Sequence, residues 1–152
     1  MYRGLSFKIP NQYGKCLLDI LQPVDCNQYN WVIDSDQSWI KNMNKKVSAE
    51  LFFKKRLKGE EIFRIISKED YYIVSARIGG YSNSEINENI KTYFGFMNSE
   101  CEIFILLVDS AYIEIYCKNV LLVESLYSNA KKKKFENLEY IDENNTRATM
   151  EI

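Results

Sequence analysis

The feature that most constrains the fold is the apolar stretch CEIFILLVDSAYIEIYCK, from Cys101 to Lys118. Two runs of β-branched and aromatic residues flank the segment DSAY, which favours a turn, so we predict a β-hairpin over about 101–118. Because side chains alternate between the two faces of a strand, a turn at DSAY places six apolar side chains on one face. They are Phe104, Leu106, Val108, Ile113, Ile115 and Cys117. Such a continuous apolar wall is typical of a scaffold rather than of a site.

Hydrophobic periodicity in the rest of the chain mixes strands with helices. Alternating patterns predict further strands at 3–9, 71–78 and about 135–142, and Gly79-Gly80 predicts a turn after the second of them. Helical spacing predicts helices within 11–21, 59–68, 84–98 and 120–130. The runs YNWVI and SWIK predict a second hairpin around DSDQ. The segment Lys41–Lys58 fits either a strand or an ordered loop.

Together these elements predict an α+β fold. We expect a single domain over 1–142, with a mixed, mostly antiparallel sheet, the central hairpin at 101–118 and helices packed on it. A polar C-terminal tail, 143–152, follows the domain. A chain of 152 residues that is 46% apolar is long enough to bury one sizeable core.

Charge and apolar run lengths restrict where the protein acts. The formal net charge of −1 gives the molecule no strong field that would attract nucleic acid or an anionic membrane. The amino terminus has no apolar run of signal-peptide length, and no later run approaches the roughly 18 residues that a membrane helix needs. We therefore expect a cytoplasmic protein that does not bind membranes.

The sequence has no histidine, which removes the commonest general base and the usual metal ligand. The four cysteines form no CxxC pair, and core packing explains them, with Cys26 expected as the exposed thiol. Asp34-Ser35-Asp36 resembles a divalent-ion motif, but a turn explains it as well. We therefore expect no enzyme, no catalytic residue, no metal site and no cofactor.

An excess of tyrosine points to binding instead. Eleven tyrosines exceed what a small core needs, and tyrosine is enriched where proteins bind other proteins. The predicted hairpin and the late edge strand place several of them on an accessible strand surface. We predict that Tyr112, Glu114, Tyr116 and Tyr140 form a surface for a protein partner. The other interpretation is that these are ordinary half-buried tyrosines.

Two basic runs provide an alternative surface. The run 41–58 contains Lys54, Lys55, Arg56 and Lys58, and the run 131–134 is four lysines. Joined into one patch, they would bind phosphate groups or nucleic acid. The other interpretation is a solvated face that neighbouring acids neutralise, because only Phe52-Phe53 supplies aromatic rings for stacking on bases.

Several stretches resemble a family of small proteins of unknown function from low-GC Gram-positive bacteria. They are RGLSFKIPNQYGKCLLDIL, DYYIVSARI, TYFGFMNSECEIFILLVDSAYIEIYCK and LEYIDENNTR. The resemblance implies a bacterial cytosolic setting and carries over no catalytic residue.

We therefore expect a non-enzymatic protein that binds a macromolecule, in the first place another protein. A toxin-neutralising immunity protein is one concrete form of this function. The alternative is a module that binds anions or nucleic acid through the runs 41–58 and 131–134.

Overall fold

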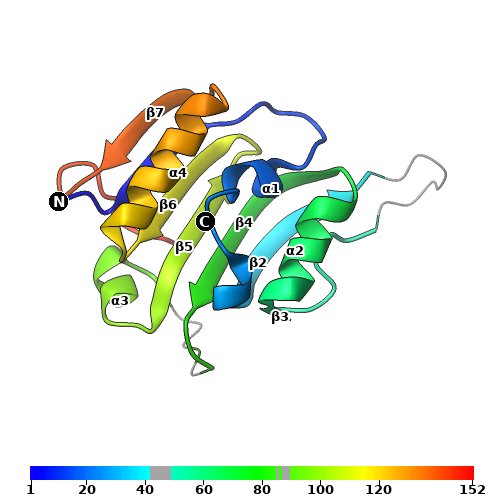
Figure 1. Cartoon of the computed structure of the whole chain (residues 1–152), viewed down its shortest axis with the longest axis horizontal. Helices are drawn as coiled ribbons and strands as arrows, with labels where there is room; N and C mark the ends of the chain where they lie inside the picture. Colours follow the sequence, from blue (N-terminus) through cyan, green and yellow to red (C-terminus); the bar gives the residue numbers. More distant parts are fainter. Residues whose placement is uncertain (42–48, 85, 87–89) are drawn as a thin grey trace.

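The chain folds into one antiparallel sheet with helices packed on it (Figure 1). The computed structural model describes residues 1–41, 49–84, 86 and 90–152. Over these residues the sheet has seven strands in the order β3-β2-β4-β5-β6-β1-β7. The strands are β1 (Gly4–Lys8), β2 (Asn30–Ile40), β3 (Arg56–Lys58), β4 (Tyr71–Tyr81), β5 (Cys101–Val108), β6 (Tyr112–Cys117) and β7 (Glu136–Ile141). The helices are α1 (Cys16–Ile20), the 3-10 turn η1 (Cys26–Gln28), α2 (Gly59–Lys68), α3 (Tyr93–Met97) and α4 (Val120–Lys132).

This arrangement confirms the predicted α+β class and the hairpin, which is β5 and β6. The predicted register of the hairpin is wrong by one residue. Val108 pairs with Tyr112, and Asp109 and Ser110 form the turn with positive φ angles of 51° and 67°. The N–H of Ala111 donates to the carbonyl of Val108 at 3.3 Å and closes this tight turn. A shift of one residue moves every side chain of β6 to the other face of the sheet.

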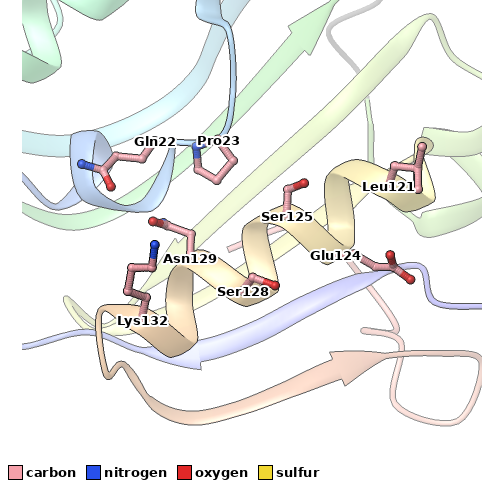
Figure 2. Close-up of a pocket in the computed structure, with 8 residues that line it drawn as sticks. All are labelled: Gln22, Pro23, Leu121, Glu124, Ser125, Ser128, Asn129 and Lys132. Atoms are coloured by element: carbon pink, nitrogen blue, oxygen red, sulfur yellow. The ribbon is translucent and has the colours of Figure 1, made fainter.

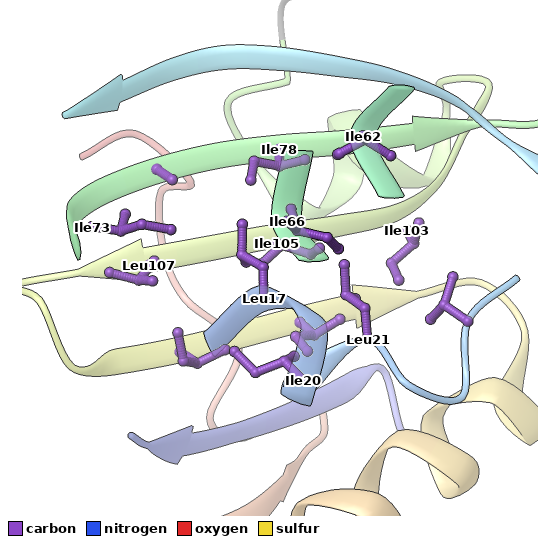
Figure 3. Packing of buried hydrophobic residues seen from close by; sticks show 14 of the residues in the cluster. Leu17, Ile20, Leu21, Ile62, Ile66, Ile73, Ile78, Ile103, Ile105 and Leu107 are labelled. Carbon is purple, nitrogen blue, oxygen red and sulfur yellow. The ribbon is translucent and has the colours of Figure 1, made fainter. Parts of the chain in front are cut away.

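The helix face of the sheet is the face covered by α1, α2 and α4. Ile103, Ile105 and Leu107 of β5 point to it, as do Ile113 and Ile115 of β6. Figure 3 shows how α1 and α2 bury apolar side chains on these strands. Each such side chain contributes roughly 1.5–3 kcal/mol to stability. The stripes predicted for 59–68 and 120–130 are the buried sides of α2 and α4.

The tail face is the opposite face, covered in part by α3 and the C-terminal residues. Phe104, Leu106 and Tyr116 lie on it and pack against Phe96 of α3 and Met150. The backbone N–H of Met150 donates to the carbonyl of Lys91 at 2.7 Å, and its side chain is fully buried. The polar segment 143–152 therefore completes the core on this face.

The hairpin predicted around DSDQ is wrong, because Asn30–Ile40 is one long strand. The register shift at Ile33/Ser35 leaves Asp34 unpaired in the ladder and interrupts the alternation of β2, whereas at Gln37/Ser38 the extra residue is Val74 of β4. The Asp34 carboxylate lies within the strand, 3.6 Å from the guanidinium of Arg77 on β4.

The turn predicted at Gly79-Gly80 is also wrong, because both glycines lie inside β4. A Cβ atom on Gly80 would lie 2.6 Å from Cγ2 of Ile103 and 3.2 Å from the ring of Trp31. Glycine is therefore required here because a neighbouring strand and a buried indole approach the backbone closely.

Of the remaining predictions, two hold for only part of the predicted residue range and one is wrong. The helix expected within 84–98 occurs as α3 only, which begins after the N-cap Thr92; residues 85 and 87–89 of the expected range lie outside the described residues. In 41–58, Arg56–Lys58 forms β3 and 42–48 lies outside the described residues. Cys26 is buried, so its predicted exposure is wrong. In the described part of the chain, no helix has the length and apolarity needed to cross a bilayer.

Candidate protein-binding surface

The half of the tail face nearest the β5–β6 turn is left uncovered by α3 and the C-terminal tail. We call this surface the open patch. Its side chains come from five neighbouring strands and are all partly or fully exposed. They are Lys8, Trp39, Tyr72, Val108, Tyr112 and Glu114.

An aromatic cluster forms one end of the open patch. The rings of Trp39 and Tyr72 stack with centroids 6.0 Å apart, and Tyr13 lies 5.4 Å from Tyr72. The indole N–H of Trp39 donates to the Tyr13 hydroxyl at 2.8 Å. Lys41 places its ammonium 5.7 Å from the Tyr13 ring. These contacts hold three aromatic rings in fixed positions at the surface.

Tyr112 forms the other end. Its side chain is 52% exposed, and Nζ of Lys8 on the neighbouring strand lies 5.6 Å from its ring. Beside it a hollow of about 450 Å³ opens between β6, β1, β7 and the tail. Polar and charged side chains line much of the hollow: Ser6, Lys8, Glu114, Glu139 and Arg147.

Glu114 anchors the tail at the edge of the open patch. Its carboxylate accepts hydrogen bonds from the Arg147 guanidinium at 3.1 Å and from the Tyr116 hydroxyl at 2.9 Å. The same hydroxyl accepts the backbone N–H of Arg147 at 3.2 Å. Burial raises the pKa of the Tyr116 phenol well above its usual value, so it stays a hydrogen-bond donor at neutral pH.

The four residues predicted as a partner surface do not all lie on one surface of the structure. Tyr112 and Glu114 lie together on the open patch. Tyr116 is fully buried, so its prediction as an accessible side chain is wrong. Tyr140 lies on the helix-face side of β7, stacked between Tyr2 at 3.8 Å and Tyr127 at 3.9 Å.

Sequence reasoning did not identify Trp39 and Tyr72 as surface residues. The signal was present, because Tyr72 lies between Tyr71 and Ile73, which both belong to the helix-face core. Alternation then places Tyr72 and its cross-strand partner Trp39 on the tail face.

The described parts of the two basic runs, 49–58 and 131–134, do not form one patch. Arg56–Lys58 is the edge strand β3, whereas 131–134 ends α4 over β1 and β7 at the other side of the sheet. Six strand spacings of about 4.8 Å separate the two edges by roughly 29 Å. Lys54 also pairs with Glu61 at 2.7 Å. The predicted anion patch is therefore reduced to the residues around β3: Lys54, Lys55, Arg56 and Lys58.

Burial raises the pKa of all four thiols, to about 11 for Cys26 and about 12 for Cys16 and Cys101, which makes them weak nucleophiles at neutral pH. Among the residues that the structure describes, no three side chains of His, Cys, Asp or Glu gather as metal ligands.

Comparison with known proteins relates this chain to a bacterial protein and to a protein family. The protein is 34% identical over 154 residues to the "Uncharacterized protein YncE" of Bacillus subtilis (strain 168), and the match covers 100% of both chains. No solved structure matches the chain. The model of the family "Protein of unknown function (DUF2691)" matches residues 2–151. The match to this family and the relative from a Gram-positive bacterium confirm the resemblance, and the chain belongs to the DUF2691 family.

Proposed function

We propose that the protein is a non-enzymatic binding protein that holds another protein on the open patch. The observation that carries the proposal is the position of Trp39, Tyr72 and Tyr112 on the uncovered half of an antiparallel sheet. Tyrosine and tryptophan supply most of the binding free energy in many protein interfaces. A sheet face that carries rings rather than small polar residues is suited to contact with a second apolar surface.

The geometry of the rings supports this function. Tyr72 and Tyr112 lie on β4 and β6, on the order of 14 Å apart from the usual strand spacing and rise. A standard interface, which covers about 800 Å² on each partner, spans both ends of the patch. Because Tyr13 and Trp39 already hold Tyr72, binding loses little side-chain entropy there.

The charge around the patch favours a protein over a nucleic acid. Lys8 and Lys41 accompany the rings, but the acids Asp109, Glu114 and Glu139 lie on or beside the same surface. A surface of mixed sign gives a phosphate backbone little net attraction and pairs well with the mixed charges of a protein. A toxin-neutralising immunity protein in the bacterial cytoplasm is one concrete form of this function.

Affinity capture with patch variants tests the proposal. The tagged protein is incubated with a Bacillus subtilis lysate at near-physiological salt, with and without nuclease, and captured proteins are identified by mass spectrometry. We expect one stoichiometric protein whose affinity falls about tenfold or more with Tyr72→Ala or Tyr112→Ala. Tyr2→Ala is the matched control, because Tyr2 is an exposed tyrosine that stacks on Tyr140 away from the patch.

The outcomes separate the candidates. If Tyr72→Ala and Tyr112→Ala both capture the partner as well as the natural chain does, the assignment of the open patch as the binding surface is wrong. Capture that nuclease abolishes moves the anion-binding alternative at Lys54, Lys55 and Arg56 to first place.

A further inference from the structure

The outer face of α4 has a second surface feature, on the side of the sheet away from the open patch. We define this face by Leu121, Glu124, Ser125, Ser128 and Lys132. Figure 2 shows these side chains along one side of the helix, with Gln22 and Pro23 forming the opposite wall of a groove of about 610 Å³. Leu121 is 72% exposed, although it is a large apolar side chain.

The order of charges along this face is self-complementary. Glu124 lies four residues before Ser128, and Lys132 lies four residues after it. At 1.5 Å per residue the two charges are about 12 Å apart, one toward each end of the helix. A two-fold axis at Ser128 that pairs α4 with an antiparallel second α4 places each Glu124 opposite the partner's Lys132.

The size of the side chains fits the same pairing. Ser125 and Ser128 are small, and they allow two helix axes to approach to the short end of the usual 8–10 Å range. Lys131 would face the partner's Ser125, which is neutral, so the pairing brings no like charges together at this position. In this pairing Leu121 would lie at the same height along the helix axis as the partner's Phe135, a half-buried ring that stacks on Phe7.

We propose that the protein forms a symmetric dimer through the outer face of α4, with a second copy of the same chain in the groove. A second copy fits because an isologous interface requires one patch that complements itself, and the acid and base are equidistant from Ser128. The net charge of −1 gives two copies almost no overall repulsion. The dimer leaves both open patches free, because they lie on the other face of the sheet.

Charge reversal tests the dimer by sedimentation equilibrium across about 1–100 μM protein. We expect the natural chain to dimerise, and Glu124→Lys or Lys132→Glu each to raise the dissociation constant roughly tenfold or more, since each creates two like-charge contacts. The double variant Glu124→Lys, Lys132→Glu restores opposite charges at both contacts and should bring dimerisation back. Circular dichroism checks that each variant folds.

Lys68→Glu is the matched control, because Lys68 is likewise an exposed lysine in the last turn of a helix, on α2. It should leave the dimer unchanged. A natural chain that stays monomeric at 100 μM overturns the proposal, and so does a double variant as weak as the single ones. The dimer is tested separately from the open patch, so a failure to capture a partner protein would leave the sedimentation result unchanged.

Discussion

Lys134, which directly follows the C-cap of α4, has a left-handed backbone conformation that a lysine adopts only at a cost in free energy. Its φ is 61°, its N–H donates to the carbonyl of Lys131, and the N–H of Phe135 donates to that of Ala130, both at 3.1 Å. This pair of bonds is the Schellman motif, in which glycine is usual at the left-handed position. We expect Lys134→Gly to raise the free energy of unfolding by about 1 kcal/mol, measured by urea denaturation.

Lys133→Gly is the control for this prediction. Lys133 has a right-handed φ of −74°, so glycine there relieves no strain and should lower stability. Equal effects of the two substitutions would mean that loss of charge, rather than backbone conformation, decides the result.

Gly80 gives the second prediction at the scale of single residues. A methyl group at Gly80 meets Ile103 and Trp31, so Gly80→Ala should destabilise the protein by about 1–3 kcal/mol. At Gly14 a Cβ atom would meet nothing within 4 Å, and Gly14→Ala should change stability by less than about 0.5 kcal/mol. Thermal unfolding of both variants compares them, and a Gly80→Ala protein as stable as Gly14→Ala would contradict the close packing of Trp31.

At the scale of elements, the C-terminal tail acts as part of the core. Met150 packs among apolar side chains of the tail face, and Arg77 donates to its carbonyl at 2.8 Å. Met150→Ala should therefore lower the free energy of unfolding by about 2–5 kcal/mol, whereas Ile152→Ala, at a 47% exposed side chain, should have little effect. Chemical denaturation measures both, and a small effect of Met150→Ala would mean that the tail is not packed as described.

Local periodicity is sufficient to predict β1, α2, α4, β5, β6 and β7, because each buries its own repeating set of apolar side chains. It fails where a distant contact decides the structure. Gly79 and Gly80 have the chemistry of a turn, yet both lie inside β4, where Ile103 and Trp31 approach the backbone of Gly80 closely. The tail is polar in composition, and its one buried methionine is identified only by the cluster that surrounds it.

The same limit applies to the candidate site. Tyr112 and Glu114 are predicted as surface residues from the pattern of β6. Tyr116 is misplaced because α3 and the tail, which cover it, are not apparent from the strand pattern. Trp39 is missed because β2 continues through five polar residues, 34–38, with a register shift at Ile33/Ser35. Tyr72 is missed although its alternation with Tyr71 and Ile73 indicates the tail face.

For the molecule as a whole, the absence of histidine determines how stability depends on pH. No side chain with an ordinary pKa between 6 and 8 is present, so we expect a flat stability profile over that range. Burial raises the pKa of Cys101 to about 12 from an ordinary value near 9. Between these values the unfolded chain has released a proton that the folded chain retains, so stability falls as pH rises above 9.

Each thiol whose pKa is raised in this way lowers the free energy of unfolding by up to about 1.4 kcal/mol per pH unit between its two pKa values. Urea unfolding at pH 7, 9 and 10 measures the decline, and Cys101→Ala should make it shallower, whatever its stability at pH 7. A Cys101→Ala protein with an unchanged slope would assign the alkaline loss to other groups.

The position of β1 has a consequence for how the chain is made. β1 (Gly4–Lys8) pairs with β6 (Tyr112–Cys117) and β7 (Glu136–Ile141), which lie far along the sequence. β1 therefore stays unpaired on the growing chain until the segment up to β7 has been synthesised. Folding is then dominated by contacts distant in sequence, which makes it slow and leaves β1 accessible to chaperones in the meantime.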